Sequence, residues 1–448
     1  MRSIAGAVRT LGSVGIRENC RVKERRASAQ LLALHGGPPV RHPSKPWPRW
    51  PGASPEAERN LLEVVHGDRW TLTSPMTGTR LFERRFAALF AEYTGTKHCV
   101  PVDHGASALV VALESLQLER GARVLVPALT WVACATAAFR AGLVPVLTDV
   151  DPDTGSMSPV DLDLSVQAQA AVVVHWSCAM ADVPSLLEIA EPAGITIIED
   201  CAQAHGAEWL GRRAGSIGRL GCYSMQHGKV LTCGEGGAIV TDDDSLAPLL
   251  EELRADARRY RPDSGRNGDS ELLETGETLG ANFCMSEFGA AVLCAQLPLV
   301  DGQHDVRERN YRLLADLLSA IPSVRLLRPR AEQTRLSIFE VPFIFEELPG
   351  DLSRAGAAEA LTAELGTRFY QTDLPLHRSP LFRPERKPSI ADLANDFASL
   401  HSDRQFARAD YLFDHSVVTH HSTLLGDESD MVDIARAVAK VTNSPAPA

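Results

Sequence analysis

The sequence has few of the features that mark several common protein classes. Its 448 residues contain no uninterrupted apolar stretch long enough to span a bilayer, which argues against a membrane protein. Positive charge is also in deficit, because 45 Lys and Arg stand against 57 Asp and Glu and the formal net charge is -12. A surplus of acidic groups argues against general binding to nucleic acid or to an anionic membrane surface.

The nine cysteines include no CxxC pair, and their number is odd. This spacing fits neither a zinc site nor a disulfide framework and favours reduced thiols in a cytoplasmic protein. Residues 1–30 are Arg-rich without a long apolar run after them, so we expect a disordered extension and no secretory signal. Nucleotide-binding motifs are missing as well: no G-x-G-x-x-G follows the first predicted strand, and no G-x-x-x-x-G-K-[ST] occurs.

Short apolar runs alternate with helical stretches from residue 98 to residue 240, which predicts an α/β fold with a largely parallel sheet. The predicted strands are 99–102, 124–127, 144–151, 170–175, 195–198 and 222–224. Residues 55–95 are predicted to be helical, with Pro55 at the start and Gly95 at the end. Beyond about residue 300 the pattern weakens. We therefore predict a large domain over 31–300 and a small α+β domain over 301–448.

The chemistry-bearing residues concentrate between residues 195 and 242. A β-branched run ends there in Glu199 and Asp200, and a carboxylate at the C-terminal end of a strand lies where α/β sheets bind ligands. Ser224 closes the next short strand, and the lone Lys229 follows five residues later. A glycine-rich turn at 234–237 ends the segment. An aspartate, a hydroxyl and a lysine near strand ends are the groups that pyridoxal phosphate (PLP) requires.

In such a site the lysine amine bonds to the cofactor's aldehyde, the aspartate keeps the ring nitrogen protonated, and the hydroxyl holds the phosphate. Spacing alone leaves an ordinary explanation open, since strand ends often carry Asp and a lone lysine is usually solvated. Residues 103–107, Asp-His-Gly-Ala-Ser, add a second feature. A glycine and small residues before a helix present backbone N–H groups and the helix dipole to an anion.

The order of these motifs resembles one known family. Glu-Asp-Cys-Ala-Gln-Ala-His-Gly-Ala at 199–207, Gly-Ser-Ile-Gly at 215–218, Ser224 to Lys229 and Gly-Glu-Gly-Gly at 234–237 closely resemble the StrS/DegT family of PLP-dependent sugar aminotransferases. The resemblance covers roughly residues 31–440. It implies the type I aminotransferase fold, PLP as the cofactor, and a homodimer with shared active sites.

The resemblance also implies roles for individual residues. Lys229 would bond to the cofactor and move protons, Asp200 would contact the pyridine nitrogen, and Gln203 would lie against the ring. The other implied cofactor contacts are Trp131 on the ring, Ala106, Ser107 and Ser224 at the phosphate, and Asn282 reaching over from the neighbouring subunit. His175 and His377 are implied on the substrate side. The chain departs from the family pattern at His104 and Ala106, which replace Asn and Thr, and at Cys284, which replaces Arg.

Several of these residues also have a plainer interpretation. Trp131 could belong to core packing, and His175, at a strand end, could be a hydrogen-bonded structural group. The Pro-rich residues 36–55 could be a simple linker or an arm that docks through Trp47 and Trp50. His420 and His421 do not predict a metal site, because neighbours in an extended segment point to opposite faces.

Residues 127–133 and 224–235 resemble the aminocyclitol branch of the family more than its nucleotide-sugar branch. We therefore expect amino transfer from L-glutamine, or L-glutamate, to a keto-cyclitol in the biosynthesis of aminocyclitol antibiotics. Two alternatives share the same cofactor residues: transfer to a nucleotide-linked keto-sugar, and dehydration with aromatisation as in aminohydroxybenzoate synthases. An alternative of another kind is a PLP-binding regulator without turnover, against which Lys229 and Asp200 argue.

Overall fold

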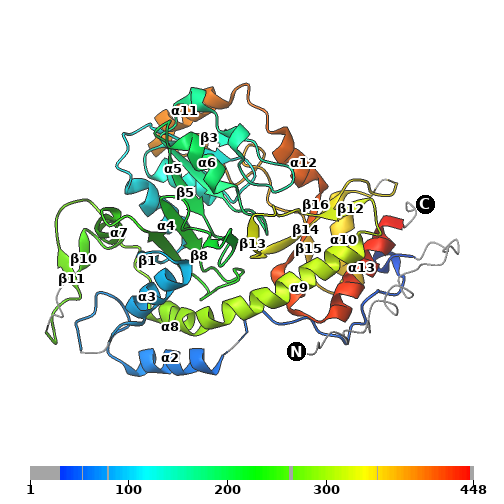
Figure 1. The fold of residues 1–448 in the computed structure, drawn as a ribbon, viewed down its shortest axis with the longest axis horizontal. Helices are drawn as coiled ribbons and strands as arrows, with labels where there is room; N and C mark the ends of the chain where they lie inside the picture. Colours follow the sequence, from blue (N-terminus) through cyan, green and yellow to red (C-terminus); the bar gives the residue numbers. More distant parts are fainter. Residues whose placement is uncertain (1–30, 53, 78–79, 262–265, 351, 444–448) are drawn as a thin grey trace, which may run out of the picture.

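Two β-sheets organise the chain, and helices surround both of them (Figure 1). The computed structural model describes residues 31–52, 54–77, 80–261, 266–350 and 352–443. The predicted extension 1–30 lies outside these residues, and so does Gly78, which the family resemblance assigns to a loop facing the partner subunit's active site. The α-helices are α2 Pro55–His66, α3 Phe82–Thr94, α4 Gly105–Glu114, α5 Ala133–Arg140, α6 Val183–Ala190, α7 Leu246–Arg254, α8 Glu287–Gln296, α9 Val300–Leu318, α10 Arg354–Leu365, α11 Ala391–His401, α12 Ala407–His415 and α13 Glu428–Asn443.

The large sheet has seven strands in the order β1-β9-β8-β5-β4-β2-β3. Their bounds are β1 His98–Val102, β2 Arg123–Pro127, β3 Val144–Thr148, β4 Ala170–Val174, β5 Thr196–Asp200, β8 Leu220–Ser224 and β9 Gly237–Thr241. Neighbours from β3 to β8 pair in parallel, whereas β9 is antiparallel to both β8 and β1. The prediction of a largely parallel α/β sheet is confirmed, and the six predicted strands are present.

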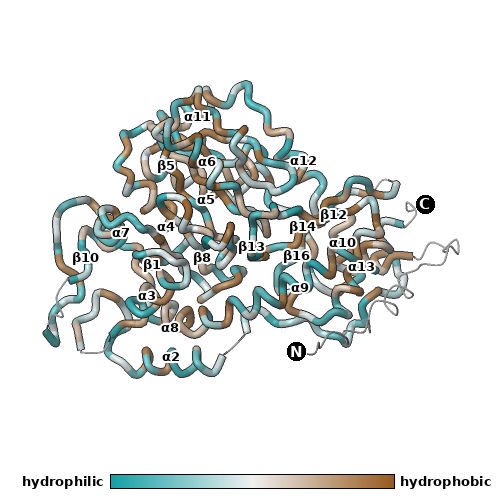
Figure 2. Tube along the Cα trace, viewed as in Figure 1, coloured by the Kyte–Doolittle hydropathy of each residue, from teal (hydrophilic) through white to brown (hydrophobic). Residues whose placement is uncertain are grey.

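Both faces of the large sheet are buried, as its apolar strands require. In β4, Val172 and Val174 belong to one apolar cluster, and Ala171 and Val173 belong to the other, because successive side chains of a strand point to opposite faces. Helices α4, α5 and α7 contribute to the first cluster, and α3, α6 and α8 to the second. Figure 2 shows the hydrophobic colouring concentrated along these central strands. Such a doubly covered sheet leaves its strand ends as the accessible places for polar side chains.

The second sheet lies C-terminal to the first and is antiparallel throughout. Its order is β12-β14-β16-β15, with bounds β12 Val324–Leu326, β14 Glu340–Phe345, β16 Ser416–His420 and β15 Phe369–Tyr370. The long helix α9 precedes it and packs on α13 (Figure 1). Short strands complete the fold: β6 Glu208–Trp209, β7 Arg212–Arg213, β13 Gln333–Arg335, β10 Arg258–Tyr260 and β11 Leu272–Glu274.

Part of the C-terminal region returns to the large sheet. Helix α11 packs on β3, and His401 Nε2 accepts a hydrogen bond from the Leu147 N–H at 2.8 Å. Arg408 on α12 then reaches the Asp149 carboxylate, just after β3, at 3.1 Å. The sequence analysis did not anticipate this return, and the domain boundary at residue 300 stays a prediction.

The predicted helical region 55–95 is two helices. Ser54 caps α2 by accepting a hydrogen bond from the Ala57 N–H, and Pro55 occupies its first turn as predicted. Helix α3 ends at Gly95, whose φ of 72° lies in the left-handed region that favours glycine. The chain between α2 and α3 is irregular, so the uniform helical prediction was wrong over that stretch.

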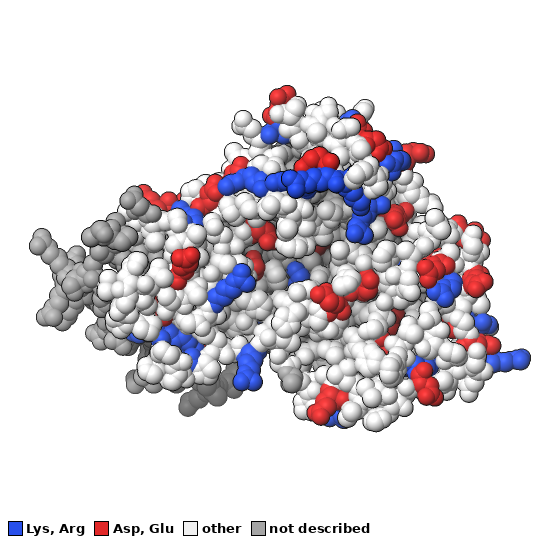
Figure 3. Space-filling view, turned by 180° about the vertical axis from the view of Figure 1, so that it is seen from behind, with Lys and Arg blue, Asp and Glu red and all other residues white. Residues whose placement is uncertain are grey.

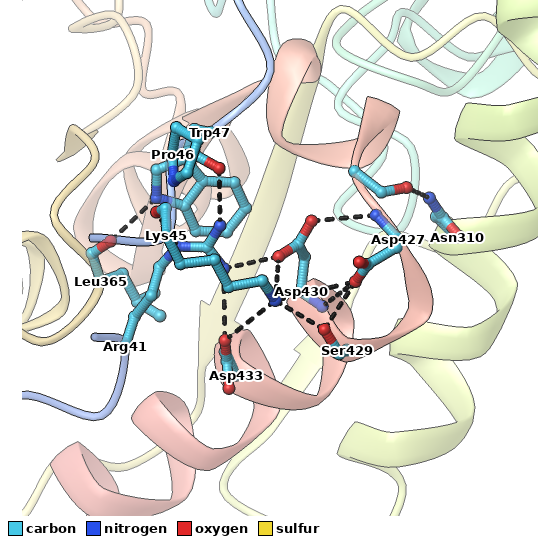
Figure 4. A network of polar contacts seen from close by, with 11 residues as sticks. Arg41, Lys45, Pro46, Trp47, Asn310, Leu365, Asp427, Ser429, Asp430 and Asp433 are labelled. Atoms are coloured by element: carbon cyan, nitrogen blue, oxygen red, sulfur yellow. Dashed lines mark hydrogen bonds and ion pairs between the residues drawn. The ribbon is translucent and has the colours of Figure 1, made fainter. Parts of the chain in front are cut away.

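The N-terminal arm before α2 is held by buried ion pairs to the last helix. Arg41, only 3% exposed, places Nη1 2.6 Å from Asp430 Oδ1 on α13 (Figure 4). Lys45 reaches the same oxygen at 2.5 Å, and the Arg41 guanidinium lies 3.8 Å from the centre of the Trp47 ring. The Trp47 indole N–H also donates to the Leu365 carbonyl at 2.8 Å. The arm is therefore docked on the C-terminal region, and is not a plain linker.

The surface carries charges of both signs. Figure 3 shows basic side chains in a row across the upper part of one face, with acidic side chains directly beside them. Ion pairs neutralise individual surface charges, and one example is Arg404, which lies 2.6 Å from Asp163. Among the described residues, no helix combines the length and the apolar character that crossing a bilayer would need.

The docked arm yields a stability prediction. Arg41→Met should lower the free energy of unfolding by about 3 kcal/mol, because it leaves the buried Asp430 with fewer cationic partners. Arg59→Met is the matched control, since Arg59 pairs with Glu56 at an exposed helix position and should change stability by less than about 0.5 kcal/mol. Urea unfolding of the two variants measures both values. Equal losses would contradict a docking role for the Arg41 pair.

Candidate active site

The carboxyl ends of five strands meet at one edge of the large sheet. Strands β2, β4, β5 and β8 run parallel, and β1 shares their direction because both it and β8 are antiparallel to β9. The pairing is in register at this edge, with Val174 opposite Asp200 and Asp200 opposite Cys222. Residues that are far apart in the sequence therefore come together here, as expected for ligand sites in α/β sheets.

A cavity of about 450 Å³ opens at this edge. Six of the predicted site residues line it: Ala106, Trp131, Asp200, Gln203, Ser224 and Lys229. Its opposite wall comes from the second sheet and the loop after it, through Phe339, Glu340 and Asp373. The cavity thus lies between the two sheets, and its walls carry different kinds of groups.

The start of α4 forms an anion-binding cradle beside Ser224. The helix begins at Gly105, and the side chain of the preceding His104 makes no capping hydrogen bond to it. A Cβ atom at Gly105 would lie 2.5 Å from Ser224 Cβ, so only glycine lets the helix terminus approach this hydroxyl residue so closely. Ala106 lines the cavity, and Ser107 is buried on the same turn. This arrangement suits a phosphate group.

Asp200 is a buried carboxylate with one defined partner on each oxygen. Its Oδ1 accepts the Ala202 N–H at 2.9 Å, and its Oδ2 accepts the Cys134 thiol hydrogen at 2.9 Å. Burial raises the pKa of Cys134 well above its usual value, and the neighbouring Asp200 charge adds to this, so the thiol remains a donor. These two donors fix the orientation of the Asp200 carboxylate. Sequence reasoning missed Cys134, because no local motif links a residue in the first turn of α5 to the end of β5.

Gln203 and Trp131 line the same cavity as Asp200. Gln203 Oε1 accepts the Ser177 N–H at 2.6 Å, which leaves the amide nitrogen as a donor. Trp131 follows β2 and is 52% exposed, so it is not a core residue. A flat planar ligand could therefore pack against the Trp131 ring and contact the Gln203 amide.

Lys229 lies on the loop after β8 and faces both sheets. Its Nζ is 4.1 Å from the centre of the Phe339 ring. Burial lowers the pKa of Lys229, and the Asp200, Glu340 and Asp373 carboxylates partly offset this effect. The lysine amine is therefore neutral more often than an exposed lysine, as a nucleophile or proton carrier requires. The Gly228 carbonyl just before it contacts His420 Nε2 at 3.0 Å and His421 Nε2 at 3.2 Å.

The docked arm reaches this loop indirectly. The Trp50 ring packs edge-on against His421, with ring centres 4.6 Å apart, and the Arg307 guanidinium lies 5.1 Å from the Trp50 ring. Because His421 contacts the Gly228 carbonyl, the arm supports the position of the Lys229 loop. The two histidines thus have a structural use, and the sequence prediction attached no metal to them.

His175 does not line the cavity. It is 1% exposed, its Nε2 lies 3.0 Å from Glu199 Oε2, and its Nδ1 accepts the Ala181 N–H at 3.1 Å. One neutral tautomer satisfies both contacts. The placement supports the plainer of the two interpretations, in which His175 is a hydrogen-bonded structural group and not a substrate contact.

His175, Glu199 and Cys201 place possible ligand atoms within 4.8 Å of one another, but their polar atoms are already engaged. Glu199 accepts hydrogen bonds from the Gly215, Ile217 and Gly218 N–H groups as well as pairing with His175. We attach no metal to this group.

His377 and Asn282 also lie outside the cavity lining. His377 is exposed and contacts Asp410 at 3.2 Å, so its predicted place beside the substrate is not seen. Asn282 is exposed, and its Oδ1 accepts only the nearby Cys284 N–H at 3.2 Å. A residue that contacts the neighbouring subunit's site must be exposed and must lie outside the cavity of its own subunit, and Asn282 meets both conditions.

Two further cavity residues carry charge that the sequence analysis did not assign. Glu340 begins β14, and Tyr370 on β15 donates its hydroxyl hydrogen to Glu340 Oε1 at 2.7 Å. Burial raises the pKa of Glu340 to about 7, whereas Asp373 is exposed at the cavity mouth. No local motif signals Glu340, whereas Asp373 lies in the stretch 369–382, which resembles a family segment beside the substrate.

The groups at this edge define the class of protein. A lysine of lowered pKa, a buried aspartate and a helix terminus beside a serine, at the carboxyl edge of a seven-stranded α/β sheet, are the parts of a type I aminotransferase. The model of the DegT/DnrJ/EryC1/StrS aminotransferase family matches residues 55–411. The chain belongs to this family, whose aminotransferases depend on PLP.

Curated relatives match nearly the whole chain. It is 42% identical over 418 residues to L-glutamine:2-deoxy-scyllo-inosose aminotransferase of Micromonospora echinospora, covering 92% of this chain and 97% of that protein. It is 40% identical over 416 residues to L-glutamine:scyllo-inosose aminotransferase of Streptomyces griseus, covering 92% and 98%. Among solved structures, 3-amino-5-hydroxybenzoic acid synthase matches with a TM-score of 0.73 at 28% identity, covering 88% of this chain and 99% of that one.

The position of His175 yields a prediction. His175→Ala should lower the free energy of unfolding by about 1–3 kcal/mol, because it leaves Glu199 short of a hydrogen bond inside the sheet. The kcat/KM of amino transfer, per folded molecule, should stay within about twofold of wild type. His42→Ala, at an exposed histidine, serves as the control for stability. A large loss of kcat/KM in a stable His175→Ala protein would restore the substrate-side role.

Proposed function

We propose that this aminotransferase binds PLP in the cavity between the two sheets and moves the amino group of L-glutamine to a keto-cyclitol. The observation that carries the proposal is the placement of Lys229, Asp200 and the start of α4 around one cavity. The names of the relatives support the substrates, since proteins 40–42% identical to this chain use L-glutamine and scyllo-inosose or its 2-deoxy form.

The residues present fit this cofactor. Ser224 and the first turn of α4, with Ala106 and Ser107, would hold the phosphate. Asp200 would take the ring nitrogen, Trp131 and Gln203 would pack on the ring, and Lys229 would bond to the aldehyde. When bound, PLP supplies an electron sink that makes the Cα–H bond of an amino acid acidic.

The chain's own groups then handle protons and orientation. Lys229 Nζ, neutral more often because of its lowered pKa, would take the Cα proton of the amino donor and later release it, acting as the proton carrier of the site. Asp200, held in place by the Ala202 N–H and the Cys134 thiol, would pair with the ring nitrogen and favour its protonated form. Phe339 and Trp131 cover apolar faces of the cavity and limit water. Donor and acceptor share this cavity, so they must use it in turn, in ping-pong order.

We further propose a homodimer with shared active sites. A second, mainly apolar cavity of about 820 Å³ lies between α2 and residues 227–234, next to the Lys229 loop. Leu62 and Val65 on α2 are 50% and 48% exposed, although a helix of this kind normally buries such residues. A second copy covering this face would bring its own residues to the edge of the first copy's site. Asn282, exposed outside its own cavity, is the residue we assign to that crossing.

A cytoplasmic location is supported by the state of the thiols. The eight cysteines in the described residues are all free, which fits a reducing compartment.

A second candidate function is dehydration with aromatisation. It is favoured by the likeness to 3-amino-5-hydroxybenzoic acid synthase, which shares the fold at 28% identity.

One prediction tests the role of Lys229. With PLP added, L-glutamine should convert the visible absorption of the wild-type protein to that of the cofactor's amine form, and 2-deoxy-scyllo-inosose should restore it. Lys229→Ala should slow the conversion by about 10⁴-fold, because the proton carrier is lost. Lys97→Ala, at an exposed lysine paired with Asp244, is the control.

Three other results would change the assignment. Restoration only by a nucleotide-linked keto-sugar would replace the keto-cyclitol. Aromatisation of an aminated or keto substrate would favour the synthase-type reaction. Bound PLP that neither glutamine nor glutamate converts would contradict amino transfer altogether.

Another prediction tests whether the two subunits share each active site. Lys229→Ala and Asn282→Ala should each be nearly inactive alone. Mixing them, with subunit exchange, should restore roughly a quarter of wild-type activity, because half of the random dimers contain one intact site. A mixture of Lys229→Ala with Asp200→Ala is the control and should stay inactive, since both residues belong to the same cavity. No recovery in the first mixture, with proven exchange, would contradict the crossing of Asn282.

A further inference from the structure

The cavity wall supplied by the second sheet is acidic. Glu340 and Asp373 line the cavity together with Phe339, whose ring centre lies 4.1 Å from the Lys229 amine. Tyr370, from the neighbouring β15, donates to Glu340 Oε1 at 2.7 Å. We call Glu340, Tyr370 and Asp373 the acidic wall. Both of its carboxylates act on the pKa of Lys229, so they lie close to the reacting end of the cavity.

Of the other lining carboxylates, Asp200 is engaged through both oxygens and Glu235 through one. Asp200 takes hydrogen bonds from Ala202 and Cys134, and Glu235 lies 3.0 Å from the His104 imidazole. Neither oxygen of Asp373, by contrast, accepts a hydrogen bond from a described residue, and Glu340 has its second oxygen left over. Among the described residues, the lining contains Lys229 but no arginine. The acidic wall therefore presents acceptor oxygens and negative charge that neither the fold nor the cofactor uses.

We propose that the acidic wall is the specificity determinant of the site: it admits neutral hydrogen-bond donors, the hydroxyl groups of the acceptor and the carboxamide of the donor, and rejects a second carboxylate or a phosphate. This inference rests on the proposed function, in which the donor is glutamine and the acceptor is a keto-cyclitol. It assigns Glu340 and Asp373 to the choice of glutamine over glutamate, and of an uncharged ring over a nucleotide-linked sugar.

The chemistry of the groups explains the selection. An ionised carboxylate only accepts hydrogen bonds, so it pairs with hydroxyl or amide N–H groups but not with another carboxylate. A like charge brought beside it in a half-buried site is repelled far more strongly than in water. Glutamine and glutamate differ at one group, and rejection of the charged form is discrimination by repulsion. Tyr370 directs Glu340 by occupying one oxygen, which leaves the other for the ligand.

The selection should depend on pH. Burial raises the pKa of Glu340 to about 7, against the hydrogen bond from Tyr370, which lowers it. The charged groups that also face Glu340 are Asp373, which raises its pKa, and Lys229 and Arg368, which lower it. Below pH 7 the Glu340 carboxyl gains a proton and the wall loses charge. The preference for glutamine should therefore weaken as pH falls from 8 to 6, and it should strengthen as pH rises.

The test uses the PLP-loaded, full-length protein and the variants Glu340→Gln, Asp373→Asn and the double substitution. The first readout is the ratio of kcat/KM for L-glutamine to that for L-glutamate in conversion of the bound cofactor. The second is the ratio of dissociation constants for glutarate and its monoamide, glutaramate, which lack the amino group and cannot react. We expect the double variant to lower both ratios about tenfold.

Glu346→Gln is the matched control. Glu346 follows β14 at its other end and likewise accepts a tyrosine hydroxyl, that of Tyr411 at 2.5 Å, but it lies outside the cavity. It should leave both ratios unchanged. Tyr370→Phe is a second probe that keeps both carboxylates. It removes a bond that lowers the Glu340 pKa, so the pH at which glutamine preference appears should move upward.

The outcomes separate this inference from the proposed function. If wild type converts with neither donor, the proposed function fails whatever the variants do. If wild type prefers glutamine and the double variant, folded and loaded with PLP, keeps the same two ratios, the acidic wall is not the determinant. A flat pH dependence of the wild-type ratio between pH 6 and 8 would exclude Glu340 and leave Asp373 to carry any effect of the double variant.

Discussion

One buried carboxylate, Glu199, holds together the part of the sheet on which the site is built. It sits at the end of β5 and takes bonds from His175 after β4 and from three N–H groups in the turn that leads to β8. Burial raises its pKa, but these donors outweigh the effect, and the net pKa is below the usual value. Because side chains alternate along a strand, the same constraint turns Asp200, the next residue, into the cavity.

The two sheets contribute different chemistry to one cavity. The parallel sheet offers strand ends, a helix terminus and a carboxylate, which together suit a phosphorylated aromatic cofactor. The antiparallel sheet brings Phe339, Glu340 and Asp373 to the opposite side. Lys229 stands between them, and its pKa reflects both, since burial lowers it while carboxylates from either side raise it. The pKa of the Lys229 amine therefore depends on groups from both sheets.

Local sequence predicted most of what depends on local pattern. The strands β1 to β5 and β8 follow from apolar runs and glycines. Asp200, Ser224 and Lys229 were singled out because they lie near strand ends within one continuous stretch, whereas a role for Gln203 was implied by the family resemblance. The predictions for His175 and His377 as substrate contacts are not supported by their positions. A family motif predicts which residue type stands at a position. It does not predict which neighbours form hydrogen bonds with that residue, as Glu199 does with His175 and Asp410 with His377.

The sequence by itself determined the α/β class, the order of the strands along the chain and the set of groups at their carboxyl ends, because periodicity and turn residues act over a few positions. Only the tertiary structure decided which distant groups share a space. Cys134 meets Asp200 across 66 positions, Arg41 meets Asp430 across 389, and Glu340 meets Tyr370 across 30. Such contacts depend on how sheets and helices pack, and burial then sets the pKa of each group that they enclose.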